Sequence, residues 1–140
     1  MPSRRLVGID VGSKRIGVSR SDPSAIIATP IGTFSNQKII SCLKDLNEED
    51  PIGTFIVGWP LSINGHLNTS TEMVEKFIKR LTKNFPQAEV VKVDERYSSE
   101  YAKQALIDSG VKKKKRSQKG LVDSTVATIL LQEYLDESYR

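Results

Sequence analysis

The sequence contains few of the residues on which disulfide-bonded, thiolate-metal and membrane proteins depend. Cys42 is the only cysteine among 140 residues, which excludes an internal disulfide and a zinc site made of thiolates. No run of about 18 apolar residues occurs, so we expect no membrane-spanning helix. The first apolar run is interrupted by Asp10, too early for a signal peptide. These absences favour a reducing, cytoplasmic location.

Length and charge narrow the possibilities further. A chain of 140 residues predicts a single domain over residues 1–140, long enough to bury a core. The 21 Lys and Arg residues outnumber the 17 Asp and Glu residues, which gives a formal net charge of +4. This small positive excess favours a polyanionic partner such as nucleic acid, without defining it.

The stretch from Arg5 to Ser19 predicts a β-hairpin. Its apolar run ends in Asp10, the chain turns at Gly12, and an alternating segment begins at Ile16. β-branched residues on both sides favour strands, and glycine allows a tight turn. Asp10 is unusual here, because an ionised carboxylate in a core strand is costly unless it is paired or bound to a metal. A turn-stabilising role is the alternative interpretation.

Apolar spacing predicts the remaining elements. We expect a third strand over Ile26–Phe34, in which Pro30 indicates an edge position or a bend, and a helix over Gln37–Glu49 with Asn36 as N-cap. The later elements are a strand over Thr54–Gly58, a loop from Trp59 to Asn68, a helix over Thr69–Asn84, a strand over Ala88–Asp94, a helix over Ser98–Ser109 and a helix over Gln118–Tyr139. This order predicts an α/β fold, with a mixed five-stranded sheet (a three-strand antiparallel meander plus parallel strands) flanked by helices.

Carboxylates end two of the strands that we expect to be parallel. Asp10 ends the first strand, and Asp94 and Glu95 end the last. The carboxyl ends of parallel strands meet at one edge of the sheet, where ligands bind in α/β folds. Strand alternation assigns Glu95 to the face of Val91 and Val93, and Asp94 to the opposite, more exposed face. We therefore expect Glu95 to be the site residue, with Asp94 as the alternative.

The final predicted helix offers a third carboxylate. Asp123 lies one turn before Ala127 and two turns before Leu130, on the apolar stripe that faces the sheet. An N-cap or a first-turn charge is the alternative interpretation. Three carboxylates gathered at one edge require a compensating cation. Oxygen ligands without His or Cys select Mg²⁺ or Mn²⁺, and two such ions would hold the attacking water and the leaving oxygen of a phosphodiester.

These residues together resemble the motifs of the YqgF/RuvX family. The resemblance rests on Gly8–Val18, Val57–Leu61, Asn64-Gly65, Asp94–Arg96, and Val122-Asp123 before Ile129–Leu131, and it covers essentially the whole chain. It implies a ribonuclease H-like fold related to RuvC resolvases. It also implies maturation of the 5′ end of pre-16S ribosomal RNA or resolution of Holliday junctions, with Asp10, Glu95 and Asp123 as the catalytic, metal-binding acids.

A basic block precedes Asp123. The block comprises Lys112, Lys113, Lys114, Lys115, Arg116 and Lys119. No acid interrupts it, and self-repulsion should keep it extended. We expect it to bind phosphates beside the site, and each neutralised phosphate adds roughly one unit to the salt dependence of binding. Further candidates for nucleic-acid contact are Lys14, Arg15 and Arg96. A solvated loop is the alternative for the block, and pairing with Asp94 is the alternative for Arg96.

Three classes of function fit the sequence. The leading hypothesis is a metal-dependent endonuclease that acts on structured RNA, with resolution of branched DNA as the alternative. A resolvase cuts two strands symmetrically and so requires a homodimer, whereas a monomer favours RNA processing. The second class is a non-catalytic, RNA-binding ribosome-assembly factor. The third is an ATPase or sugar kinase, because Gly8–Ser13 also resembles the phosphate loop of the actin-like superfamily, whose members bind ATP between two such domains.

Overall fold

The computed structural model describes residues 5–12, 14–59, 69–94 and 119–138, and it describes only the backbone of residues 69, 70, 119–123 and 138. The elements are β1 (Arg5–Val11), β2 (Ile16–Ser21), β3 (Ala28–Phe34), α1 (Ile39–Glu49), β4 (Ile52–Trp59), α2 (Thr69–Asn84), β5 (Glu89–Asp94) and α5 (Lys119–Ser138). The expectation that the loop from Trp59 to Asn68 begins at Trp59 is wrong, because Trp59 belongs to β4. The rest of that loop and the helix expected over Ser98–Ser109 lie outside the described residues.

The five strands form one mixed sheet in the order β3-β2-β1-β4-β5. β1, β2 and β3 are antiparallel neighbours, whereas β1, β4 and β5 run parallel. The predicted mixed sheet is therefore confirmed, and so is the edge position of Pro30 in β3. The parallel strands β1, β4 and β5 end at the same edge of the sheet, which we name the rim.

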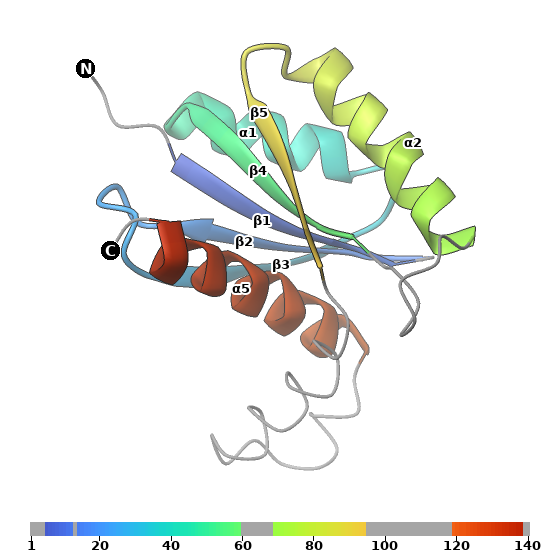
Figure 1. Ribbon diagram of the computed structural model, residues 1–140. Helices are drawn as coiled ribbons and strands as arrows, with labels where there is room; N and C mark the ends of the chain where they lie inside the picture. The colour runs from blue at the N-terminus through green and yellow to red at the C-terminus, as the bar shows by residue number, and fades with distance from the viewer. Residues whose placement is uncertain (1–4, 13, 60–68, 95–118, 139–140) are drawn as a thin grey trace.

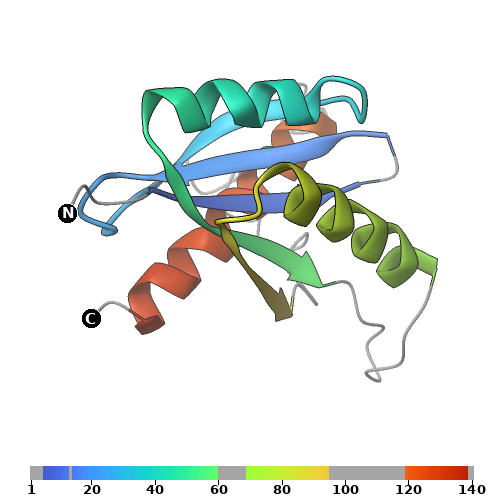
Figure 2. The ribbon, with the colours of Figure 1, turned by 90° about the horizontal axis from the view of Figure 1, so that it is seen from above.

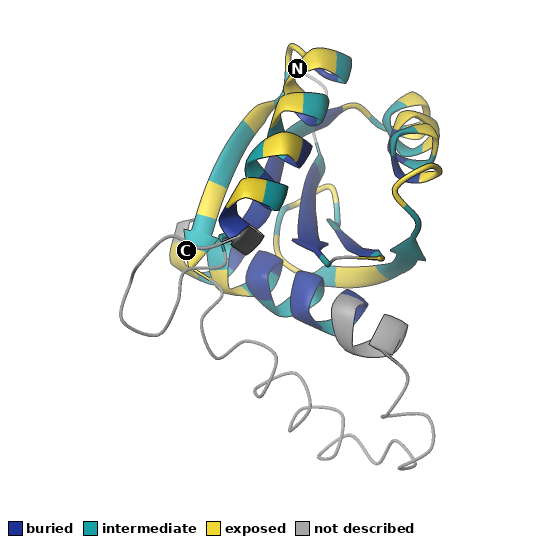
Figure 3. Ribbon diagram, turned by 90° about the vertical axis from the view of Figure 1, so that its right-hand side faces the viewer, coloured by how far each residue is buried: buried dark blue, intermediate teal, exposed yellow. Residues whose placement is uncertain are grey.

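Helices cover both faces of the sheet. α1 and α2 lie on one face, and α5 crosses the other (Figures 1 and 2). The side chains of β1 alternate between these layers: Val7, Ile9 and Val11 pack with α1 and α2, while Leu6 packs with α5. Asp10 has the parity of Leu6, so it belongs to the α5 face. Figure 3 shows the buried residues on the central strands and on the helix faces that turn toward them.

The core on the α1/α2 face is the larger of the two. It joins alternate residues of β1, β2 and β4 to the apolar stripes of both helices. β4 contributes to both cores, because Phe55 and Val57 face α1 and α2 while Ile56 faces α5, and all three are fully buried. Burial on both faces explains why this strand reads as a continuous apolar run.

α5 approaches the sheet closely at Gly8. A Cβ atom on Gly8 would lie 2.6 Å from the carbonyl oxygen of Ala127 and 2.9 Å from Cβ of Leu131, and it would also overlap Oγ of Ser19. The Ser19 hydroxyl donates a buried hydrogen bond of 2.8 Å to the same Ala127 carbonyl. Glycine at this position therefore allows the helix backbone to contact the centre of the sheet.

The turn between β2 and β3 is tied down by side chains. The Asp22 carboxylate accepts hydrogen bonds from the backbone N–H groups of Ile26 and Ile27, at 2.7 and 2.9 Å. Gln132 of α5 accepts a bond from the backbone N–H of Ala28 and donates one to the Ile26 carbonyl, both at 2.9 Å. The turn is thus fixed to the helix across the edge of the sheet.

The expected N-cap at Asn36 is wrong. α1 begins at Ile39, and Lys38 occupies the N-cap position without a side-chain capping bond. The Ser35 carbonyl instead accepts the backbone N–H groups of Lys38 and Ile39. Asn36 has another role, since its backbone carbonyl accepts a hydrogen bond of 3.0 Å from the side chain of Arg80 in α2. In the part of the chain that the structure describes, no helix is long and apolar enough to cross a membrane.

Candidate active site

Asp10 lies near the carboxyl end of β1, at the rim and in the middle of the sheet. Its side chain belongs to the α5 face, and the residue is only 9% exposed. In the antiparallel pairing, Asp10 is opposite Gly17 of β2. In the parallel pairing, Ile9 is opposite Val57, so the next row of the same register sets Gly58 beside Asp10. The carboxylate therefore has a glycine on each neighbouring strand, and neither adds a side chain beside it.

The end of β5 separates the two candidates for the second acid. Val91 and Val93 pack in the cores on the α5 face. Lys92 lies on the opposite face, where its Nζ forms an ion pair of 2.7 Å with Glu75 of α2. Asp94 has the parity of Lys92 and is exposed, as the sequence predicts, so it does not share a face with Asp10. Glu95 lies outside the described residues.

α5 runs against the direction of β1, with its first turns toward the rim. Leu6 packs with Leu131 and Leu135 near the far end of β1, while Gly8 contacts Ala127 and Leu131. Each step along β1 toward the rim therefore corresponds to a step back along α5. Asp10, two residues after Gly8, lies nearest to the turn of α5 that precedes Ala127. That turn contains residue 123, whose backbone alone is described.

The predicted apolar stripe of α5 is confirmed. It consists of Val126, Ala127, Leu130, Leu131 and Leu135, each at most 2% exposed. Among the residues with described side chains, no three His, Cys, Asp or Glu groups form a cluster that could hold a metal ion. Two of the three predicted ligands, Glu95 and Asp123, have no described side chain.

The basic candidates fall mostly outside the described residues. Lys14 is exposed and Arg15 half-buried at the tip of the first hairpin, where the backbone N–H of Gly12 donates to the Arg15 carbonyl at 2.8 Å. The Nε atom of Arg15 is buried, and no atom of the described residues accepts a hydrogen bond from it. The structure describes only the backbone of Lys119. The other basic candidates lie outside the described residues: Arg96, Lys112, Lys113, Lys114, Lys115 and Arg116.

The predicted site did not include the residues that form its floor and hold its helix. Gly17 and Gly58 flank Asp10, and Gly8 and Ser19 set the distance between α5 and the sheet. A usable signal was present, because glycine inside a strand pattern often marks a close approach of backbone. No pattern in the sequence indicated the hydrogen bond from Ser19 to the Ala127 carbonyl, because the two residues lie 108 positions apart in the chain.

The arrangement defines a protein with the ribonuclease H-like fold of RuvC. RuvC of Thermus thermophilus in complex with a Holliday junction substrate aligns with a TM-score of 0.56 at 13% sequence identity, over 96% of each chain. A second Thermus thermophilus RuvC structure aligns with a TM-score of 0.52, also at 13% identity, over 95% of this chain and 96% of that one. At this identity the likeness establishes the fold alone.

Sequence similarity defines the family. The sequence model of the family described as "RuvX: Holliday junction resolvase" matches residues 4–137. The chain therefore belongs to the RuvX (YqgF) family. A protein of Prosthecochloris aestuarii is 40% identical over 97% of this chain and 96% of its own. One of Salinibacter ruber is 41% identical over 96% of this chain and 94% of its own. Both carry the name "Putative pre-16S rRNA nuclease".

Proposed function

We propose that this protein is a metal-dependent endonuclease that hydrolyses phosphodiester bonds at the 5′ end of pre-16S ribosomal RNA. The observation that carries the proposal is the carboxylate of Asp10, 9% exposed at the rim and flanked by glycines on the face that α5 covers. The names of relatives that align along nearly the whole chain support both the reaction and the substrate.

Two further acids complete the site in this proposal. Continuing the alternation of β5 by one residue assigns Glu95 to the face of Val91 and Val93, which is also the face of Asp10. Helical spacing assigns Asp123 to the buried stripe of α5, in the turn nearest Asp10. The three acids then come from the centre of the sheet, its edge and the covering helix.

The donor set suits a hard divalent cation. Asp10, Glu95 and Asp123 offer only carboxylate oxygens, which Mg²⁺ and Mn²⁺ accept as ligands. The burial of Asp10 fits the same requirement, because a buried carboxylate needs a cation or hydrogen-bond donors to stay ionised. When bound, two such ions supply Lewis-acid stabilisation of the charge on the reacting phosphate. The chain's own part is to fix these carboxylates, with Asp10 held in the central strand and Asp123 in a helix pressed onto it.

Basic residues around the rim would hold the nucleic-acid backbone. Lys14 and Arg15 follow β1 within five residues of Asp10. The buried Nε of Arg15 has no acceptor among the described atoms, which costs about 1–3 kcal/mol unless a ligand or another part of the chain accepts its bond. The remaining phosphate contacts in the proposal are Arg96, Lys112, Lys113, Lys114, Lys115, Arg116 and Lys119.

The experiment that tests this function removes the charge of Asp10 and leaves its size. We expect Asp10→Asn to abolish Mn²⁺-dependent cleavage of a pre-16S RNA with a 5′ extension and to weaken Mn²⁺ binding measured by calorimetry, with the fold retained. Asp45→Asn, on the exposed side of α1, is the matched control and should keep both properties. Equal cleavage by Asp10→Asn and wild type would overturn the catalytic assignment and favour a non-catalytic RNA-binding assembly factor.

A second candidate, resolution of branched DNA, is favoured by the family description and by the RuvC fold. The two substrates are distinguished by offering pre-16S RNA and a four-way DNA junction side by side, with and without Mn²⁺. Symmetric cleavage of the junction by a homodimer would favour the resolvase, because two cuts related by a two-fold axis require two active sites. Cleavage of the RNA by a monomer supports the proposed function.

A further inference from the structure

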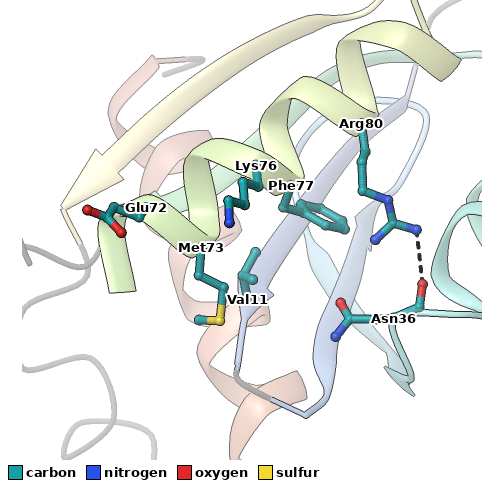
Figure 4. Close-up of a pocket in the computed structure, with 7 residues that line it drawn as sticks. All are labelled: Val11, Asn36, Glu72, Met73, Lys76, Phe77 and Arg80. Atoms are coloured by element: carbon teal, nitrogen blue, oxygen red, sulfur yellow. Dashed lines mark hydrogen bonds between the residues drawn. The ribbon is translucent and has the colours of Figure 1, made fainter. Parts of the chain in front are cut away.

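A pocket of about 320 Å³ lies on the opposite face of the sheet from Asp10, between α2 and the end of β1. Figure 4 shows the seven side chains that line it. Its lining residues are Val11, Asn36, Glu72, Met73, Lys76, Phe77 and Arg80. The floor is apolar, whereas two cationic side chains, one carboxylate and one amide surround it.

The pocket lies at the same rim as the candidate active site. Val11 directly follows Asp10, and successive residues of a strand point to opposite faces. Val11 therefore lines the pocket on the α2 face, while Asp10 belongs to the α5 face. A polymer that passes over the end of β1 reaches both sites within a short length of chain.

The cationic side chains of the pocket come from adjacent turns of α2. Arg80 is held in place, since its Nη2 donates to the Asn36 carbonyl at 3.0 Å and its guanidinium lies 5.8 Å from the ring centre of Phe77. Lys76 is exposed and forms no ion pair with any residue that the structure describes. Glu75, a neighbouring acid on the same helix, is already paired with Lys92. The described residues that line the pocket thus carry a net positive charge, because Glu72 is the one acid among them beside Lys76 and Arg80.

We infer that this pocket binds one unpaired nucleotide of the nucleic-acid substrate, with the base over the apolar floor and the phosphate beside Lys76 and Arg80. The inference rests on the proposed function, because it concerns the strand that the active site cuts. A volume of about 320 Å³ is at the small end of ligand pockets, as suits a single nucleotide. Bases bind apolar and aromatic platforms regardless of sequence, and cations beside them bind the backbone.

The test measures binding directly, in a chain that carries Asp10→Asn so that the probe is not cut. The probe is a fluorescein-labelled, single-stranded RNA of twelve nucleotides, and its Kd is measured by anisotropy over a range of salt concentrations. Lys76→Gln removes the pocket cation, and Lys79→Gln removes an exposed cation of the same helix that does not line the pocket. Both sites are exposed, so the two variants should keep the stability of the parent.

We expect Lys76→Gln to weaken binding about 3- to 10-fold and to lower the salt slope by about 0.7, the value for one phosphate contact on a single strand. Lys79→Gln should change Kd less than 2-fold. Binding of a fully paired RNA duplex should be the same in both variants, because a paired base cannot enter the pocket. Equal effects of the two substitutions on the single strand would overturn the inference.

Recognition of the base is tested at the floor of the pocket. The parent chain should bind the RNA roughly 5- to 150-fold more tightly than an abasic sugar-phosphate chain of equal length, if one base stacks. Met73→Gln should reduce this ratio, and an unchanged ratio would show that the pocket holds phosphate only. Failure of the parent chain to bind any nucleic acid would overturn the proposed function. Normal cleavage of pre-16S RNA by the wild-type chain, together with equal Kd values for Lys76→Gln and Lys79→Gln in the parent chain, would overturn the pocket alone.

Discussion

Because α5 contacts the sheet closely at Gly8, we predict that adding one methyl group there will lower activity more than it lowers stability. A Cβ atom in Gly8→Ala would lie 2.6 Å from the Ala127 carbonyl oxygen, so α5 must move away by about 0.9 Å to reach an ordinary contact distance. Overpacking of this size costs about 1–3 kcal/mol. For a chain of this length, each kcal/mol lowers Tm by roughly 3–5 °C.

The expected loss of activity is larger than the loss of stability. α5 carries residue 123, and displacing a catalytic group by about 1 Å can lower a rate on the order of 100-fold. Leu43→Val is the matched control, because it removes about 1 kcal/mol by deleting one buried methylene on the α1/α2 face and leaves the contact of α5 intact. Thermal unfolding and single-turnover cleavage, measured below the lower Tm, distinguish the two effects.

Two results would refute this reasoning. Wild-type Tm and activity in Gly8→Ala would mean that α5 is not held against the sheet as the geometry requires. The second result is the same loss of activity per kcal/mol of lost stability in Gly8→Ala and in Leu43→Val. It would mean that the spacing of α5 has no special importance for the site.

Three further predictions concern parts of the fold outside the site. Ser21→Ala removes the acceptor of a buried backbone N–H of β1 and should cost about 1–3 kcal/mol in urea unfolding, more than the 0.5–1.5 kcal/mol expected for Ser19→Ala; the reverse order would contradict this. Burial raises the pKa of the Cys42 thiol, so iodoacetamide should react more slowly at pH 8 with the folded chain than with the urea-unfolded chain, and equal rates would contradict the burial. The backbone N–H of Ile27 is the main cause of a lowered pKa at Asp22, so the carboxylate should protect the amide of Ile27 from hydrogen exchange above the ordinary carboxyl pKa and lose this effect as pH falls through the lowered value. Asp22→Ala should lack the protection at every pH, and a wild-type pattern in that variant would refute the role of the carboxylate.

Much of the fold was predictable because its periodicities are strong. The helix over Thr69–Asn84 matches its predicted bounds, since its apolar residues repeat at helical spacing and glycine and proline are absent from it. The mixed sheet followed from three consecutive strand patterns and then strands separated by helices. The start of α1 was mispredicted, because the helix begins three residues after Asn36 and the backbone carbonyl of Ser35 accepts the first N–H groups, so no side-chain cap is needed.

The candidate site was predictable only where alternation and helical spacing determine a face. Asp10 was assigned to an interior position, and its burial confirms that assignment. Asp94 was expected on the exposed face, and it lies there. The tightness of the contact between Gly8 and α5 could not be predicted, because it depends on a helix more than a hundred residues later. The roles of Glu95 and Asp123 stay predictions.

The edge position of β5 has a consequence for the heat sensitivity of the enzyme. Among the strands that the structure describes, β5 pairs only with β4. Lys92 of β5 forms an ion pair with Glu75 of α2 and lies over the ring of Trp59. Detaching such a border strand takes less free energy than melting the whole sheet. If Glu95 is an essential ligand, catalysis should fail on warming before circular dichroism registers any loss of helix.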